Sequence, residues 1–276
     1  MFCYINEEGI VSEKQRYGRS VIQSHARFSY EIVQDIIEGK IKPGEVPAGY
    51  GVTKYADEKK VFESIGMLSK VARVLRTNRM NNGAITIDTP KKKFELDARL
   101  WPTSYTIEER FEANFLVEEF MLLANVKVAE ILVDNCREAA VLRRHPFPGE
   151  AKLKKFGDFT RRLGLDIHLT KATKISEEMN RIIGNEEIKS SLRKLAKYEM
   201  LFLMEAADYF LVKDTEVDLW YHYALNFRCY THFTSPIRRY PDILVHRELI
   251  KVIELKQEAM KQMSIPNLEK VLLRCN

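Results

Sequence analysis

The chain has 276 residues, of which 45% are hydrophobic, so it can bury a sizeable core, and we expect one large domain rather than two small ones. Its 44 basic residues against 39 acidic ones permit binding to a polyanion without demanding it. The four cysteines lie far apart without metal-ligand spacing, and no apolar run approaches membrane-spanning length. These features argue against a zinc site, a disulfide framework and a membrane anchor, and they favour a reducing compartment.

The first elements in chain order are weak strands followed by two helices. Ser29 is a candidate N-cap for a helix that ends at Gly39. The stretch 40–52 is rich in proline and glycine and predicts a surface loop. Apolar residues at helical spacing from Val61 to Leu75 then predict a second helix, which Asn81-Asn82-Gly83 brings to an end.

The middle of the chain combines strands and helices. Residues 84–88 and 94–97 alternate like two paired strands. A central helix carrying Glu119 is predicted next, because Leu116, Phe120, Leu123, Ala124 and Val128 share one face. Further helices are predicted around residues 153–163, around residues 179–183, and from Ile188 toward Phe210.

The segment Tyr223 to Arg247, YALNFRCYTHFTSPIRRYPDILVHR, combines ring-bearing side chains with arginines. Each proline disfavours helix at the residue before it, so Arg238 and Arg239 are predicted to lie on a rigid turn before a helix that begins at Pro241. A guanidinium offers a planar fork of donors suited to phosphate, and the rings of His232, Phe233 and Tyr240 could stack on bases. For an arbitrary pair of arginines, pairing with nearby carboxylates is the commoner role.

The stretch YTHFTSPIRRYPDILVHR resembles the signature of the ribonuclease II/R family, the RNB-domain exoribonucleases that hydrolyse RNA from its 3′ end. Three more segments resemble the same family in the same order, and with the first they extend the similarity over nearly the whole chain. They are RSVIQSHARFSY, LVEEFMLLANVKVAE and AVLRRHPFP. The phrases EEFMLLAN, LRRHP and YALN are most similar to the eukaryotic cytoplasmic branch that acts without the exosome core.

The resemblance implies an α+β fold: a helix-rich partial RNB catalytic domain over residues 1–276, with helices packed on a small, mainly antiparallel sheet. It implies attack of an Mg²⁺-activated water on the last phosphodiester, releasing nucleoside monophosphates. The aspartates of the chain are scattered, so the Mg²⁺ ligands are expected outside it, in a missing N-terminal part, and the C-terminal end of the domain is also expected to be missing. Single-stranded RNA is the expected partner and the cytoplasm the expected location, while the sequence indicates no particular protein partner.

Arg238 is the candidate catalytic residue, since it matches the family arginine whose fixed charge would stabilise the transition state at the scissile phosphate. Glu119 matches a position that contacts the terminal nucleotide in bacterial relatives, although spacing alone favours a solvated flank. Arg143 and Arg144 form a basic turn that could contact phosphate or pair with nearby glutamates. The other candidate RNA-binding residues are His232, Thr234, Ser235, Arg239 and Tyr240. No metal ligand is assigned.

Two further points qualify the resemblance. Ile87 stands where bacterial relatives carry a base-stacking phenylalanine, which puts that stacking contact in doubt. His145, His232 and His246 have no second His or Cys at metal-ligand spacing, so each is expected to play a structural hydrogen-bonding role. Three interpretations remain open: part of a hydrolytic 3′ exoribonuclease, which we prefer; a non-catalytic RNA-binding relative; and a helical interaction protein with no RNA role.

Overall fold

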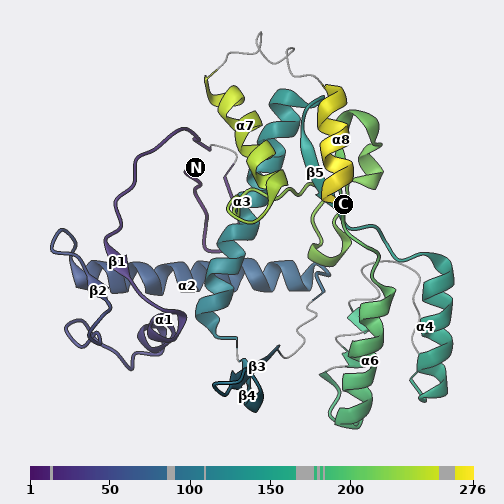
Figure 1. Ribbon diagram of the computed structural model, residues 1–276, viewed down its shortest axis with the longest axis horizontal. Coiled ribbons are helices and arrows are strands. Elements are labelled where there is room, and N and C mark those ends of the chain that lie inside the picture. Colours follow the sequence, from purple (N-terminus) through teal and green to yellow (C-terminus); the bar gives the residue numbers. More distant parts are fainter. Residues whose placement is uncertain are drawn as a thin grey trace.

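The computed structural model describes residues 1–12, 15–85, 91–108, 110–165, 177–178, 181–182, 184–254 and 265–276 (Figure 1). Helices predominate, and the named strands of this part form three separate two-stranded antiparallel ladders. The predicted α+β class with small antiparallel sheets is therefore confirmed. In the same residues, no helix is both long and apolar enough to cross a membrane.

The N-terminal elements lie around one long helix. Strand β1 (Ala26–Arg27) pairs with β2 (Gly51–Val52), and α1 (Tyr30–Ile37) lies between them in the chain. The predicted cap of α1 is confirmed, because Ser29 Oγ accepts a hydrogen bond from a first-turn amide at 3.5 Å. The second predicted helix is also confirmed and is longer than expected, since α2 covers Glu58–Asn81.

The next ladder corrects the predicted strand pairing. Alternation predicted that residues 94–97 pair with residues 84–88, but β3 (Lys91–Leu96) pairs with β4 (Pro102–Glu108). The pairing expected for 84–88 falls largely on residues 86–90, which lie outside the described part of the chain.

A tight reversal explains this hairpin. The Asp97 carboxylate accepts hydrogen bonds from the amides of Arg99 and Trp101 at 2.8 and 2.9 Å. Aspartate commonly stabilises turns in this way, because its short side chain reaches the backbone two residues further on. Leu100 completes the reversal with a positive φ of 64°. The sequence pattern indicated a strand here, but strand alternation does not reveal which neighbour closes on it.

Helix α3 (Glu112–Cys136) packs across α2 and leads into the second half of the chain (Figure 1). The later elements are β5 (Val141–Arg144), α4 (Glu150–Arg162), α6 (Ser190–Leu203), β6 (Asp208–Leu211), three short 3-10 helices (Val212–Asp214, Val217–Leu219 and Tyr223–Leu225), α7 (Tyr240–Glu254) and α8 (Ile265–Cys275).

One predicted helix is too long. The helix expected to run from Ile188 toward Phe210 ends at Leu203, because Phe210 belongs to β6 and pairs with Leu142 of β5. Tertiary pairing has overridden the helical spacing at this point. The helix expected around residues 179–183 falls mostly on residues outside the described part.

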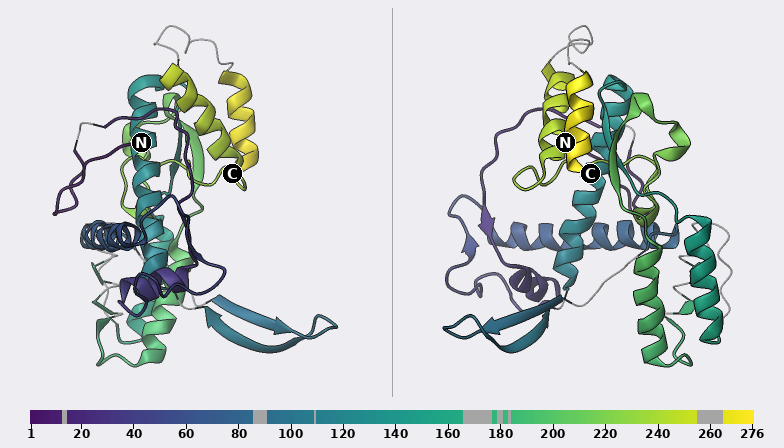
Figure 2. Two further views of the ribbon diagram at one scale, coloured as in Figure 1. Left: turned by 90° about the vertical axis from the view of Figure 1, so that its left-hand side faces the viewer. Right: turned by 45° about the vertical axis from the view of Figure 1, so that its right-hand side comes forward.

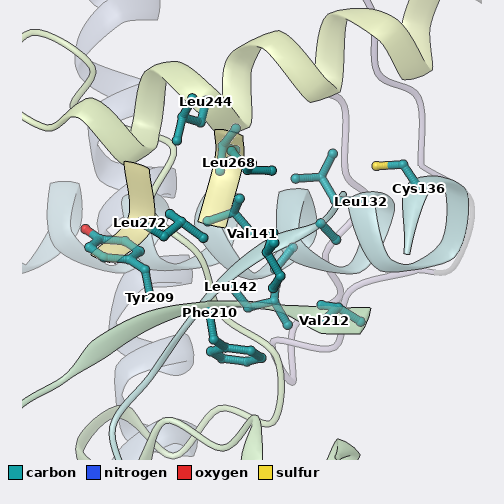
Figure 3. Packing of buried hydrophobic residues seen from close by; sticks show 14 of the residues in the cluster. Leu132, Cys136, Val141, Leu142, Tyr209, Phe210, Val212, Leu244, Leu268 and Leu272 are labelled. Carbon is teal, nitrogen blue, oxygen red and sulfur yellow. The ribbon is translucent and has the colours of Figure 1, made fainter. Parts of the chain in front are cut away.

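The main hydrophobic core joins the second half of α3, the β5–β6 ladder, α7 and α8 (Figure 3). Leu132, Leu142 and Phe210 are buried there beside Leu244 of α7 and Leu272 of α8. Burying side chains of this size contributes about 1.5–3 kcal/mol each, so α7 and β5 are firmly held against one another. This core therefore fixes the two segments that carry the candidate arginines.

Candidate nucleic-acid interface

The turn before α7 is pinned by a buried carboxylate. Asp242 is 0% exposed and accepts a hydrogen bond from the Ser235 amide at 2.7 Å. It also binds the Arg239 guanidinium with both oxygens, each at 2.8 Å. The amides of Arg238 and Arg239 donate to the Ser235 carbonyl at 3.3 and 3.2 Å. The rigid turn predicted from the prolines is present, and α7 begins at Tyr240, one residue earlier than expected.

This arrangement separates the two adjacent arginines. The Arg239 guanidinium donates two hydrogen bonds to Asp242. The Arg238 side chain, in contrast, is exposed and pairs with no carboxylate of the described residues. A charge-assisted, two-point bond is strong and directional, so Arg239 is held in place rather than freed for a ligand. Arg238 is the one whose guanidinium remains open to a phosphate.

The β5–β6 ladder separates the other arginine pair in a similar way. Arg144 lies opposite Asp208 and binds it with three contacts of 2.9–3.1 Å. Arg143 lies opposite Tyr209, and its guanidinium carbon is 4.5 Å from the centre of that ring. Arg144 therefore adopts the ion-pairing alternative, with an aspartate in place of the expected glutamate, while Arg143 is stacked on an aromatic face.

His232 brings these two segments together. Its Nδ1 lies 2.5 Å from the Tyr209 hydroxyl. Burial lowers the pKa of His232 to about 3, and the positive charges of Arg239, Arg143 and Arg238 act in the same direction. Arginines from β5 and from the turn thus surround a single neutral imidazole. The result is a local concentration of positive charge with rings beside it, which is the chemistry that a single-stranded nucleic acid requires.

Asn125 is a positioning residue that sequence reasoning missed. It is 3% exposed on α3, donates to the Tyr230 hydroxyl at 3.0 Å, and accepts from the Phe233 amide at 3.0 Å. It therefore ties the irregular segment before the turn to the central helix. The available signal was an amide side chain inside the apolar run MLLANVKVA, because a buried amide needs partners.

Of the remaining candidates in the motif, Thr234 and Ser235 are partly buried and Tyr240 is 45% exposed. The predicted structural role of two histidines is confirmed. His145 Nε2 lies 2.8 Å from the Glu205 carbonyl, and His246 Nε2 lies 2.9 Å from the Phe233 carbonyl.

Glu119 lies at a different place from the arginine cluster. It is 3% exposed, and its carboxylate binds the guanidinium of Arg79 on α2 at 2.5 and 3.2 Å. The solvated flank that spacing favoured is wrong, because α2 crosses α3 at this point and covers the face. Glu119 borders a cavity of about 90 Å³ together with Phe227. Ligand pockets usually span ~300–1,000 Å³, so this cavity has no room for a nucleotide.

The described residues do not fit a magnesium site. No group of three or more His, Cys, Asp or Glu side chains within them is placed to hold a metal ion. The candidate Glu119 and the two carboxylates that pair with candidate arginines, Asp208 and Asp242, are each engaged by an arginine. Ile87, whose stacking role was in doubt, lies outside the described residues.

Comparison with known proteins decides the family. The sequence model of the RNB domain matches residues 2–255. The chain belongs to the RNB family. The resemblance to the ribonuclease II/R exoribonucleases is therefore confirmed, and relatives named DIS3-like exonuclease 2 are among the matches.

Two curated relatives from Arabidopsis thaliana show how this RNB chain relates to longer proteins. "Inactive exonuclease DIS3L2" and "DIS3-like exonuclease 2" are each 38% identical to it over 263 residues, which is 94% of this chain and 24% of each relative. The chain thus spans about a quarter of the length of these relatives. Because one is described as inactive and both are equally similar, identity alone does not assign activity.

A solved structure supports the RNB fold. RNase R of Mycoplasma genitalium, in complex with ribose-methylated single-stranded RNA, superposes with a TM-score of 0.75 at 21% identity. The superposition covers 97% of this chain and 38% of that one. At this level of identity the match establishes the fold alone.

Proposed function

We propose that this RNB chain binds single-stranded RNA through Arg238 and Arg143 and contributes the phosphate-binding arginine to hydrolytic 3′–5′ exoribonuclease activity. The observation that carries the proposal is Arg238, whose backbone lies on a pinned turn and whose exposed guanidinium has no carboxylate partner among the described residues. Membership of the RNB family supports RNA as the polyanion.

The chemistry follows from the charge that hydrolysis creates. A water oxygen bonds to phosphorus while the bond from phosphorus to the departing 3′ oxygen breaks, and negative charge builds on the phosphate oxygens. The pinned turn holds the backbone from which Arg238 extends, and its guanidinium, placed beside the phosphate, stabilises that charge. In this proposal Arg239 and Asp242 hold the turn, and Arg238 makes the contact. We propose Mg²⁺ as cofactor, held by carboxylates other than those described.

The test is the affinity for a fluorescein-labelled single-stranded RNA, measured by anisotropy at several salt concentrations. Arg238→Gln should weaken binding and reduce the slope of log affinity against log salt by about one, as expected for the loss of one phosphate contact. The matched control is Arg162→Gln, which removes another exposed arginine in the last turn of α4 and should change neither quantity.

Two results would contradict the proposal: RNA affinity that does not depend on salt, or equal effects of the two substitutions. Circular dichroism of each variant checks that the fold is retained, which is expected because both side chains are exposed.

A second candidate function is RNA binding without catalysis. Two observations favour it: the described residues hold no carboxylate group suited to a metal, and an equally similar relative is described as inactive. Both candidates predict the same binding result, so activity must be measured separately.

A further inference from the structure

His232 uses only one of its two ring nitrogens within the fold. Its Nδ1 lies 2.5 Å from the Tyr209 hydroxyl. Its Nε2 has no hydrogen-bond partner in the described part of the chain. Nor does Nε2 belong to the buried side-chain atoms that lack a partner there, so solvent reaches it. The fold therefore leaves one polar atom of this ring open to a ligand.

Two buried tyrosines fix the orientation of the His232 ring. Tyr209 and Tyr230 are 7% and 4% exposed. The centre of each phenol ring lies 5.6 Å from the centre of the imidazole, with interplanar angles of 68° and 79°. Edge-to-face contacts of this kind are favourable. Tyr230 is held in turn by its hydrogen bond from Asn125. The open Nε2 is therefore held in one direction by packed neighbours.

The hydrogen bonds at Tyr209 decide which nitrogen of His232 carries the proton. Burial raises the pKa of the Tyr209 hydroxyl, against the positive charge of Arg143 and a hydrogen bond from that side chain, so the hydroxyl keeps its proton. A guanidinium has donors only, so the Tyr209 oxygen accepts from Arg143 and its O–H donates to His232 Nδ1. A proton on Nδ1 would leave that O–H without an acceptor among the described residues. The neutral ring therefore carries its proton on Nε2.

The groups around His232 favour an anion as the acceptor of this proton. Charged groups that act on the pair of His232 and Tyr209 come from β5, the turn and α7, and they include Arg143, Arg238, Arg239 and Asp242. Asp242 balances the charge of Arg239. Arg143 and Arg238 have no carboxylate partner among the described residues. Two uncompensated positive charges beside an N–H donor attract a negatively charged oxygen.

We propose that His232 is an RNA-binding residue that donates its Nε2–H to a phosphate oxygen of the strand held by Arg143 and Arg238. This inference rests on the proposed RNA binding, and it gives His232 a role other than the base stacking that its ring suggested in the sequence. A charged acceptor strengthens such a hydrogen bond. Because the donor is uncharged, it orients the phosphate without adding to the salt-dependent part of the affinity.

The test is the affinity of the full chain for the fluorescein-labelled RNA at several salt concentrations. His232→Asn keeps an acceptor for the Tyr209 hydroxyl but is too short to replace Nε2. Its affinity should fall at least about tenfold, as expected for the loss of a hydrogen bond to a charged group. The slope of log affinity against log salt should stay that of the parent, whereas Arg238→Gln reduces it by about one.

Two further variants control this experiment. His232→Gln places an amide nitrogen near the position of Nε2 and should recover most of the affinity. His25→Asn replaces an exposed histidine that precedes β1 and should leave affinity within about twofold. The right-hand view of Figure 2 shows β1 beside α2 and away from the β5–β6 ladder, so this control lies outside the arginine cluster.

A second measurement does not depend on how the variants fold. Nitrogen-15 NMR of the histidine-labelled parent distinguishes a protonated from an unprotonated ring nitrogen, and the signals of His232 are assigned through the backbone. The proton should lie on Nε2 and Nδ1 should stay unprotonated from pH 5.5 to 8. Adding RNA should shift the Nε2 signal.

Several results would overturn the inference. They are a proton on Nδ1 in the free chain, an affinity of His232→Asn equal to that of the parent while Arg238→Gln weakens binding, and equal losses in the Asn and Gln variants, which would indicate stacking by the ring. An affinity that rises steeply below pH 6.5 in the parent but not in His232→Asn would show an imidazolium contact instead. If Arg238→Gln also binds like the parent, the proposed RNA site fails together with this inference.

Discussion

His232 is kept neutral by its surroundings, and this has a consequence for stability. Burial holds the pKa of the folded imidazole near 3, while an unfolded histidine titrates near 6.5. As pH falls below 6.5, the His232 imidazole binds a proton in the unfolded chain but not in the folded chain. The free energy of unfolding must therefore decrease. Above pH 6.5 the effect is absent.

His232→Asn should remove this contribution, because asparagine can still accept a hydrogen bond from the Tyr209 hydroxyl but does not titrate. Urea unfolding at a series of pH values should give the parent a steeper loss of stability below pH 6.5, by up to ~1.4 kcal/mol per pH unit. His222, whose pKa burial also lowers to about 3, is present in both proteins and cancels from the difference. Parallel curves for the two proteins would show that His232 is not held neutral.

The two adjacent arginines, Arg238 and Arg239, show which features of the site the sequence does not reveal. The prolines around Arg238 and Arg239 predicted the rigid turn, and the motif predicted its chemistry. Which arginine remains open depends on which one Asp242 binds, and Asp242 binds Arg239 and not its neighbour. Asp242 lies in the first turn of α7, but its role as the anchor of the preceding turn follows only from three-dimensional contact.

At the scale of elements, the crossing of α2 and α3 depends on a buried ion pair. Glu119→Met should leave the Arg79 guanidinium buried without its main partner and destabilise the fold by about 3 kcal/mol. This is the lower end of the usual range, because Glu118 remains 3.7 Å from Arg79. The double variant Arg79→Met with Glu119→Met should recover most of the loss, since two apolar side chains can fill the same space.

The same variants separate the two roles considered for Glu119. If its role is to hold the helices together, the double variant should bind RNA as tightly as the parent. A double variant that is stable but binds RNA weakly would instead support contact with a nucleotide. Glu118→Gln is the control at the neighbouring carboxylate, whose side chain is 30% exposed and lies near Arg76, Arg79 and Arg110. Because the amide oxygen still accepts hydrogen bonds from these arginines, stability should change by less than about 1 kcal/mol.

Helices were predicted better than strand partners, for a physical reason. Helical periodicity and caps such as Ser29 are local, so the sequence window that forms a helix also reveals it. Strand pairing joins distant residues: β5 meets β6 across more than sixty residues, and Phe210 leaves a predicted helix to complete that ladder. The pairing of Phe94 with Tyr105 was missed because the turn at Asp97 decides it.

At the scale of the whole molecule, we expect this chain to bind RNA without hydrolysing it. The purified chain with Mg²⁺ should release nucleoside monophosphates from RNA no faster than buffer does, because no described carboxylate cluster can hold the metal. Anisotropy on the same sample should nevertheless report RNA binding. An active RNB exoribonuclease run in parallel shows that the conditions support turnover. Robust release by the chain itself would mean that the metal ligands have been misplaced.

The α+β class and the family could both be predicted from the sequence, because the motif around Arg238 is long and lies in order with three other segments. The sequence did not predict that most of the buried hydrophobic residues lie beyond Leu122. Apolar residues occur throughout the chain, and composition does not tell which of them find partners.

The pairing of β5 with β6 also limits how this protein can change during evolution. Side chains alternate between the two faces of a strand, so adding or losing a single residue within either strand would shift the pairing beyond that point and turn the side chains there to the other face. Arg143 would lose its place over Tyr209, and Arg144 would no longer meet Asp208. The two strands can therefore drift in composition, but their lengths should be inherited unchanged.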